Sequence, residues 1–592
     1  MLLLRGVNEL FSLNRYLFIY RWRLLAGCVC IIASNLFAVY PAKITRQIID
    51  TAILTGGKQL SLMASETIKS KLLHLLMLLL VATVLKGVFM FLMRQSLIVM
   101  SRFVEYDLKN EIFSKLQKLP MGFYKHAHTG DVMSRMSEDV GHVRMYVGPS
   151  LMYLINLMVM SVMVIYAMFS VNTVLACWVL LPLPFLSLVV YAISRIIQKQ
   201  STRIQSQVGW ISTLAQETFS GIRVVQSLAA GPEFKKRMQQ EGEKYFQYTT
   251  QQIFTEALYQ PAIGFLIGLS VLLTVLVGGI LVSKGEITPG NIAEFILYVY
   301  MLTWPFTSLG WVSALMQKAA ASMRRINQLL DTEEAPLIRL SASEQISKSN
   351  IRLEAVTVQY AGMQQPALHR VSLNIATGSS LGITGRTGSG KSTLLHVLSG
   401  FVYPTSGNLY LNDHPLPHLH VKELRQMTGL ASQDVFLFSD TIQNNIAFAK
   451  PGASRQEVEL ASEMACFHQT VMQFGNKYDT LLGERGINLS GGQRQRLSLA
   501  RAFLAKPSLL MIDDCLSALD TATESSVVKE IMQMKGVTKL LAAHRLSTLM
   551  MCDTIIYLEN GSIVEQGTHA QLMEIKGRYY QTWLHQHAHH QN

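Results

Sequence analysis

One short stretch of the chain has the residue types and spacing to hold a phosphate chain. Glycines at fixed intervals let backbone N–H groups curl around phosphate oxygens at the start of a helix, and the lysine pairs with the β- and γ-phosphates. The apolar residues before the stretch predict a strand and those after it, from Thr393 onward, predict a helix, as this loop requires. The stretch consists of Gly385, Arg386, Thr387, Gly388, Ser389, Gly390, Lys391 and Ser392.

A magnesium ion bound to such a phosphate chain needs an acidic residue at the end of a neighbouring buried strand. Residues 508–513 (SLLMID) are apolar and end in Asp513, at the sheet edge where ligands bind in open α/β folds. Together with the Ser392 hydroxyl, Asp513 is the predicted magnesium site, acting through the water shell of the ion. The alternative, an ordinary surface aspartate after a strand, is disfavoured by the upstream loop.

A second candidate anion cradle follows in the same half of the chain. Ser490 is a helix-capping residue, and Gly491, Gly492 and Gln493 begin a helix rich in arginine. One nucleotide triphosphate needs only one such cradle. Two interpretations stay open: a simple capped helix, or a cradle that closes on the nucleotide of another copy.

The elements that must position these residues differ between the two halves of the chain. From Ile351 onward, short β-branched runs alternate with helical patterns, which predicts an α/β domain. Upstream, residues 24–42, 72–93, 145–194, 257–283 and 295–317 carry almost no charge. The third run is long enough for two helices and has a turn at Ser170–Thr173, so the sequence predicts six membrane-spanning helices.

Composition agrees with a membrane protein, because 49% of the residues are hydrophobic and only 15% are charged. The net charge of +13 is attributed to Lys and Arg in the connections between the spans. Lys and Arg number eight in each of residues 94–144 and 195–256, against five in residues 43–71 and one in the loop at Lys284. This asymmetry predicts that both termini are cytoplasmic and argues against nucleic-acid binding. The long cytoplasmic connections are predicted to be helical stalks, with tips near His126–Asp131 and Glu217–Ile222; helices lying on the membrane surface are the alternative.

These motifs in this order resemble the half-molecules of ABC transporters with the six-helix exporter fold, and the resemblance covers nearly the whole chain. The residues that carry it are the LSGGQ signature at Leu489–Gln493, Gln433 and His544 beside the phosphate loop. The resemblance implies an all-α six-helix transmembrane domain followed by an α/β P-loop ATPase domain with a helical subdomain. It also implies ATP and Mg²⁺ as cofactors, adenine stacking on Tyr360, Gln433 as a γ-phosphate sensor and magnesium ligand, and His544 at the γ-phosphate.

Two residues depart from the family pattern. Arg386 stands where the family usually has proline, and Asp514 stands where its general base is usually glutamate. An aspartate is one methylene shorter, and a displacement of about 1 Å costs about 10²-fold in rate. Asp514 resembles the degenerate-site subunit of heterodimeric exporters, which favours a heterodimer; a slowly hydrolysing homodimer is the alternative.

We therefore expect ATP-driven export or flipping of hydrophobic or amphiphilic compounds across the cytoplasmic (inner) membrane, by a dimer with a second half-transporter. A regulatory, catalytically weak ATP-binding subunit and an importer on the same fold are the alternatives. The expected domains are residues 1–330 (membrane), 331–350 (linker) and 351–592 (ATP-binding).

The sequence indicates less about the substrate than about the ATP site. Lys86, within the second span, suggests an anionic amphiphile if it faces a cavity, or a side chain that reaches the lipid headgroups. The His-rich tail at residues 585–590 is read as a frayed polar end rather than a metal site, and the six cysteines as neither disulfides nor zinc ligands. A set of Met and aromatic residues is interpreted as packed or lipid-facing, with an adaptable pocket as the alternative: Met158, Met160, Met163, Tyr298, Tyr300, Met301, Trp304 and Phe306.

Overall fold

The structure is a computed structural model that describes residues 9–55, 62–334, 350–360, 362–412, 414–415 and 421–588. The expected linker at 331–350 therefore lies mostly outside the described residues. The chain divides into two compact units, and each is described by itself. The first unit holds residues 1–117 and 127–332, and the second holds residues 118–126 and 333–592.

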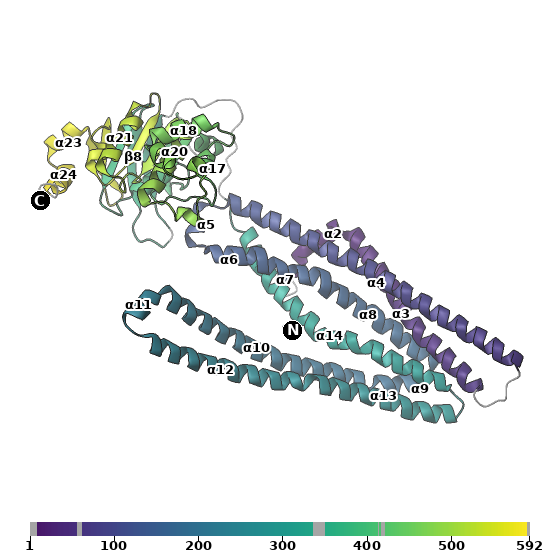
Figure 1. Ribbon diagram of the computed structural model, residues 1–592. Coiled ribbons are helices and arrows are strands. Elements are labelled where there is room, and N and C mark those ends of the chain that lie inside the picture. Colours follow the sequence, from purple (N-terminus) through teal and green to yellow (C-terminus); the bar gives the residue numbers. More distant parts are fainter. Residues whose placement is uncertain are drawn as a thin grey trace. The chain divides into compact units, whose positions relative to one another are not determined.

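The first unit is entirely helical in its described part and contains the six predicted spans (Figure 1). Each is long and apolar enough to cross a membrane, which confirms the expected transmembrane domain. The first, second and sixth are α3 (Arg21–Thr55), α4 (Leu62–Lys118) and α14 (Pro289–Leu330). The third combines α6 (Thr129–Ser134), α7 (Val140–Met145) and α8 (Leu151–Val171); the fourth, α9 (Thr173–Leu180) and α10 (Pro182–Ser220); the fifth, α12 (Gly231–Ala257) and α13 (Tyr259–Ser283).

The breaks between these helices have local causes. Asn172 has an extended backbone, and its side chain accepts a hydrogen bond from the Leu175 N–H, so it ends α8 and caps α9 within the predicted turn. Pro182 stands at the start of α10, whereas Pro305 lies inside an uninterrupted α14. Before α3, the chain forms a short turn (Phe11–Leu13) and α2 (Asn14–Ile19).

The stalk tips are displaced from their expected positions. The short helix after Pro120 is α5 (Met121–His126), and α6 already begins at Thr129. The second short helix, α11 (Ile222–Ser227), follows Gly221, while Glu217 still belongs to α10. Proline and glycine therefore end the long helices a few residues away from the predicted tips.

Two π-helical turns interrupt the third span, at Arg135–Asp139 and Tyr146–Ser150. The first ends at Asp139, whose carboxylate is 1% exposed and forms an ion pair with Arg325 of α14. One residue inserted into a helical turn rotates the side chains that follow it, so this turn aims Asp139 at α14. Helix α10 runs beside α12 and α13, and α14 beside α3 and α8 (Figure 1).

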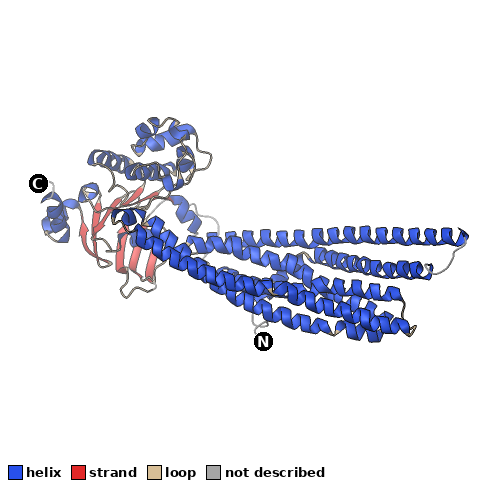
Figure 2. Ribbon diagram, turned by 60° about the horizontal axis from the view of Figure 1, so that its bottom comes forward, coloured by secondary structure: helices blue, strands red, loops and turns tan. Residues whose placement is uncertain are grey.

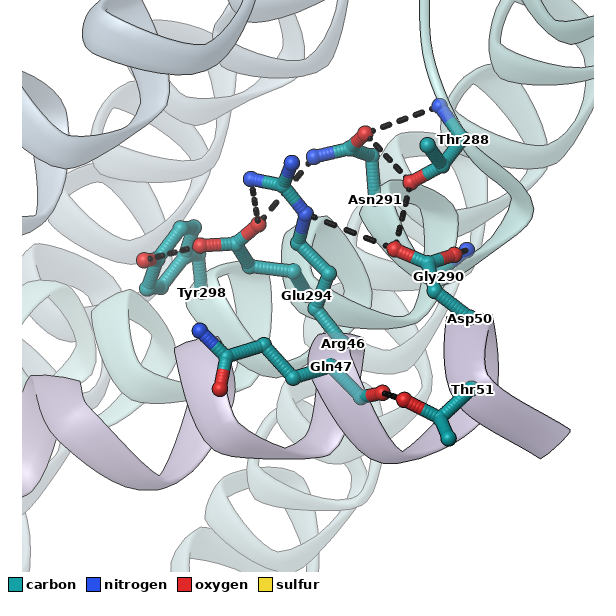
Figure 3. Close-up of polar contacts among 9 residues, drawn as sticks. All are labelled: Arg46, Gln47, Asp50, Thr51, Thr288, Gly290, Asn291, Glu294 and Tyr298. Atoms are coloured by element: carbon teal, nitrogen blue, oxygen red, sulfur yellow. Dashed lines mark hydrogen bonds and ion pairs between the residues drawn. The ribbon is translucent and has the colours of Figure 1, made fainter. Parts of the chain in front are cut away.

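A buried carboxylate joins the first and sixth spans (Figure 3). Glu294 on α14 has a fully buried side chain and accepts hydrogen bonds from Tyr298 (2.7 Å) and Asn291 (3.2 Å). The guanidinium of Arg46 on α3 lies 3.6 Å from Glu294 and 3.6 Å from Asp50. Asp50, in turn, accepts from the backbone N–H of Gly290 and from Thr288 at the start of α14.

The Met and aromatic residues interpreted as packed or lipid-facing fall into two groups. Tyr298 is fully buried and engaged with Glu294, and Met160, Met163, Met301 and Phe306 pack against the helical core. Met158, Tyr300 and Trp304 are exposed in the single chain. Lys86 is also exposed.

The second unit is built on two sheets, with helices beside them (Figure 2). An antiparallel sheet has the order β2-β1-β4-β5, with β1 Ile351–Val358, β2 Leu368–Ile375, β4 Ser406–Leu411 and β5 His414–Pro415. The larger sheet has the order β10-β9-β3-β8-β7-β6: β3 Ser380–Gly385, β6 Thr428–Ala431, β7 Leu509–Asp513, β8 Thr538–Ala542, β9 Thr554–Glu559 and β10 Ser562–Gly567. This α/β domain confirms the predicted fold class.

Strands β6, β7, β8, β3 and β9 are parallel, and β3, β7 and β8 are buried along their whole length. Unbroken apolar runs such as LLMI suit strands covered on both faces. The helices are α15 Lys391–Leu398, α16 Val421–Met427, α17 Ile442–Ala447, α18 Arg455–Met464, α19 His468–Met472, α20 Gly491–Leu504, α21 Thr521–Gln533, α22 Leu546–Leu549, α23 His569–Ile575 and α24 Arg578–Ala588.

Candidate nucleotide-binding site

The carboxyl ends of four neighbouring parallel strands carry the predicted site residues. Strand β3 runs into the phosphate loop at Gly385, β7 ends at Asp513, and Gln433 and His544 each follow two residues after the ends of β6 and β8. Ligands bind at this edge of open α/β sheets. The fold therefore brings together residues that are up to about a hundred and sixty positions apart in the sequence.

The loop between β3 and α15 has a backbone that only glycines adopt easily. Gly388 and Gly390 have φ of 82° and 103°, and a Cβ at Gly390 would lie 2.5 Å from the Ala367 carbonyl oxygen. Arg386 and Thr387 are exposed at the tip of the loop. Arg386, which departs from the family pattern, therefore occupies a solvent-facing position in the loop.

The Lys391 ammonium lies over the loop, where it donates to the carbonyl oxygens of Gly385 (2.8 Å) and Arg386 (3.0 Å). Burial lowers the pKa of Lys391, while Asp514 and Asp513 act in the opposite direction. The hydroxyl of Ser389 is buried, with no hydrogen-bond partner among the described residues. A buried cation held only by carbonyls, beside an unsatisfied hydroxyl, fits a site that takes an anionic phosphate chain.

Ser392 and Asp513 meet next to this loop, since the Ser392 hydroxyl donates to Asp513 Oδ1 at 3.1 Å. Asp513 is 6% exposed. A hydroxyl and a carboxylate in contact provide the hard oxygen ligands that Mg²⁺ prefers. The donor set therefore fits magnesium.

Asp514 lies close to residues that follow the neighbouring strands. Its backbone has φ 46°, in the left-handed region, and its N–H donates to the Ala542 carbonyl at the end of β8. The carboxylate oxygen Oδ2 lies 3.5 Å from Gln433 Nε2 and 4.0 Å from His544 Nε2. Burial raises the pKa of Asp514, and Asp513 adds to that rise, whereas His544 and Lys391 oppose it.

Tyr360 lies beside the start of α15, with its hydroxyl 3.5 Å from the Thr393 hydroxyl. Its ring is half-buried and packs against the core of the two sheets.

The signature residues form a separate cradle at the start of α20. Ser490 Oγ accepts from the Gln493 N–H, and the Gln493 side chain accepts from the Ser490 N–H, which is a complete capping box. Gly492 packs against the Ala518 carbonyl, where a Cβ would lie at 3.0 Å. A cavity of about 380 Å³ beside this helix is lined by Gln433, Asp434, Val435, Phe436, Arg485, Gly491, Arg494 and Gln495.

Sequence reasoning missed two sets of contacts around His544. Arg545 forms an ion pair with Glu524 of α21 and donates to the Leu519 carbonyl oxygen, and Thr548 also donates to Glu524. On the other side, Gln586 of α24 contacts the backbone at His544 and Leu546. No periodicity or motif marks Gln586, because its partners lie about forty residues away.

The tail differs from its expected frayed state. Residues up to Ala588 are helical in α24, and the His587 ring stacks on Trp583 at 4.1 Å. His589 and His590 lie outside the described residues. Among the residues that the structure describes, no cluster of His, Cys, Asp and Glu is arranged to hold a metal ion, and the described cysteines are free.

Both units match known protein families. Residues 24–306 match the family model described as the ABC transporter transmembrane region, and residues 368–517 match the one described as ABC transporter. An uncharacterized ABC transporter ATP-binding protein of Bacillus subtilis, YknU, is 34% identical over 80% of this chain and 81% of its own length. The chain belongs to the ABC transporter family.

Two further relatives have names that describe a cargo. The ATP-dependent lipid A-core flippase of Syntrophus aciditrophicus is 32% identical over 81% of this chain and 80% of its own length. The multidrug resistance-like ATP-binding protein MdlA of Escherichia coli is 31% identical over 81% of this chain and 82% of its own length. A solved bacterial Atm1-family ABC exporter with ATP bound shares the fold, with a TM-score of 0.78 at 23% identity over 96% of this chain and 99% of its own.

This ABC transporter is thus a half-transporter with the exporter fold, with a six-span membrane domain and an ABC ATPase domain in one chain. Its fold implies assembly with a second half.

Proposed function

We propose that this transporter exports or flips hydrophobic or amphiphilic compounds across the cytoplasmic membrane, driven by ATP. The observation that carries the proposal is the convergence of Lys391, Ser392, Asp513, Asp514 and His544 at one edge of a parallel sheet. The relatives named for lipid A-core and for multidrug resistance support this class of cargo. The asymmetry of Lys and Arg between the loops supports cytoplasmic termini.

The proposed chemistry assigns each residue of the site a task. The loop glycines and Lys391 bind the β- and γ-phosphates, and Lys391 exchanges its two carbonyl partners for phosphate oxygens. Ser392, Asp513 and Gln433 would hold Mg²⁺, which would supply positive charge against the phosphate oxygens. Tyr360 borders the adenine, and Asp514 orients and deprotonates the attacking water while His544 contacts the γ-phosphate.

The second half of each ATP site is proposed to come from a partner. Ser490, Gly491, Gly492 and Gln493 present backbone N–H groups and a helix amino terminus, and they lie on α20 rather than on the strand edge. In a dimer, this cradle would close on the partner's nucleotide. Binding of ATP then holds two ATP domains together, and hydrolysis releases them.

Asp514 supports a heterodimer in which this chain's own site hydrolyses ATP slowly. The aspartate carboxylate is one methylene short of the glutamate usual in the family, and its left-handed backbone is fixed by the bond to Ala542. The main chain therefore has little freedom to move the carboxylate towards the water. The partner would contribute the faster site, completed by the signature residues of this chain.

We also propose that residues 1–330 form the membrane domain, residues 331–350 the linker and residues 351–592 the ATP-binding domain. The six spans lie within the first range. Strand β1 begins at Ile351, the first residue of the last range.

ATP turnover of the chain purified alone in lipid tests the proposal, beside Lys391→Ala and Asp514→Glu. We expect low turnover in the wild type, an increase of about tenfold or more in Asp514→Glu, and loss in Lys391→Ala. Brisk wild-type turnover that Lys391→Ala abolishes would show a working homodimer. Turnover unaffected by Lys391→Ala would remove this loop from the chemistry.

A further inference from the structure

The loop that carries His544 is held by a contact from helix α24 of the same domain. Strand β8 ends at Ala542, and the Ala543 N–H still donates to the Ile383 carbonyl of β3. After that bond, the backbone leaves the sheet and enters the four-residue helix α22 at Leu546. The side chain of His544 is 41% exposed, so its position depends on how its backbone is fixed.

Gln586 holds the backbone on the carboxyl side of the histidine, from the His544 carbonyl to the Leu546 N–H. Its amide nitrogen donates to the His544 carbonyl at 2.7 Å, and its amide oxygen accepts from the Leu546 N–H at 3.0 Å. The Leu546 N–H begins α22 and has no partner within that helix, and Arg545 at the capping position supplies no side-chain cap. Gln586 therefore acts as a cap that comes from another helix.

Helix α24 is anchored well enough to hold Gln586 in place. Tyr579 is fully buried and bonds to His569 at 2.8 Å, Thr582 meets the Tyr557 hydroxyl at 3.2 Å, and Trp583 packs on the core. These residues and Gln586 recur every three or four positions and so share one face of the helix. The next turn of that face brings Gln586 to the His544 loop.

We propose that Gln586 is a positioning residue that sets the His544 side chain at the γ-phosphate, so that α24 tunes how this site distinguishes ATP from ADP. The inference rests on the proposed role of His544 in ATP handling. In this proposal Gln586 acts through the His544 backbone and contacts neither the nucleotide nor the metal. A glutamine suits the task because its amide carries an N–H donor and an acceptor oxygen side by side, which match the His544 carbonyl and the Leu546 N–H.

The test compares the affinity of the full-length chain in lipid for a non-hydrolysable ATP analogue and for ADP, both with Mg²⁺. This readout does not depend on the turnover rate of the site. The variants are Gln586→Met, which removes both hydrogen bonds at similar size, Gln586→Glu, which keeps only the acceptor, and His544→Ala as the reference. Gln581→Met is the matched control, since Gln581 is exposed on the same helix.

We expect Gln586→Met to lower the preference for the ATP analogue over ADP by about tenfold, as the loss of two backbone hydrogen bonds implies. The change should approach that of His544→Ala, with Gln586→Glu intermediate and Gln581→Met unchanged. Hydrogen exchange at the Leu546 amide should accelerate by a similar factor in Gln586→Met only. If Gln586→Met does not fold, the comparison of Gln586→Glu with Gln581→Met decides.

An unchanged preference in the Gln586 variants, with a reduced one in His544→Ala, would overturn this inference and leave the proposed function standing. An unchanged preference in His544→Ala would overturn the role of His544 itself, and this inference with it.

Discussion

Asp514 shows how one residue can be constrained more by its backbone than by its side chain. It follows a fully buried strand, turns into the left-handed region and is fixed by a hydrogen bond to the neighbouring strand. An L-residue pays about 1–2 kcal/mol for this conformation. Such strain is tolerated where the surrounding structure fixes it, here by the convergence of β7, β8 and the phosphate loop.

The protonation of Asp514 gives a prediction at the residue scale. Burial raises the pKa of this carboxyl above the value of about 3.9 for an unperturbed aspartate. A base works only when deprotonated, so activity is lost as the pH falls through the raised pKa. We expect kcat/KM for ATP to fall on acidification at a higher pH than an ordinary aspartate would give.

The measurement is a pH profile of ATP turnover for the wild type and for Asp514→Asn. The asparagine variant should retain only a low rate that lacks this acidic limb. The same acidic limb in both proteins would assign it to another group.

At the scale of elements, the contact between α3 and α14 combines two carboxylates with one guanidinium (Figure 3). Asp50 is compensated by the amino terminus of α14, through the Gly290 N–H, so Arg46 is left to balance the buried Glu294. Tyr298 and Asn291 satisfy the remaining acceptor capacity of Glu294. The network holds the first and sixth spans together at one end in this conformation.

We predict that Glu294→Ala destabilises the membrane domain by about 3 kcal/mol, at the lower end for a broken buried ion pair because Arg46 is 38% exposed. Thermal unfolding of the detergent-solubilised chain measures it, with Glu286→Ala in the neighbouring exposed loop as the control. The double variant Arg46→Met/Glu294→Leu should recover part of the loss, since it leaves neither charge of the Arg46–Glu294 pair without its partner and Asp50 keeps its bonds to Gly290 and Thr288. Equal melting of Glu294→Ala and Glu286→Ala would contradict this account.

At the scale of the whole molecule, the connections between successive spans alternate between the two sides of the membrane. The exposed loop at Glu286 precedes α14, and Glu233 lies in the first turn of α12 beyond the stalk tip. The proposed topology places the first outside the cell and the second in the cytoplasm.

Cysteine labelling in intact cells tests this topology with a membrane-impermeant maleimide. Glu286→Cys should react in intact cells, and Glu233→Cys only after lysis. Both are made in a Cys177→Ser background, because Cys177 is exposed. The reverse pattern would invert the proposed orientation.

The sequence by itself determined the six spans, the phosphate loop with Lys391 and Ser392, and the carboxylate of Asp513 at the end of a buried strand. These features are local, because a span depends on length and apolar composition and a phosphate loop on consecutive glycines. The LSGGQ signature was legible for the same reason. The stalk tips were displaced by a few residues, since Pro120 and Gly221 end the helices where several nearby residues were plausible stops.

Only the tertiary structure decided which distant residues meet. The approach of Gln433 and His544 to Asp514 depends on the order of four parallel strands, and the contact of Gln586 with the His544 loop depends on how α24 docks. The pairing of Arg46 with Glu294 likewise requires α3 and α14 to be neighbours. Such contacts arise from packing between segments far apart in the chain, and no local pattern of residue types records them.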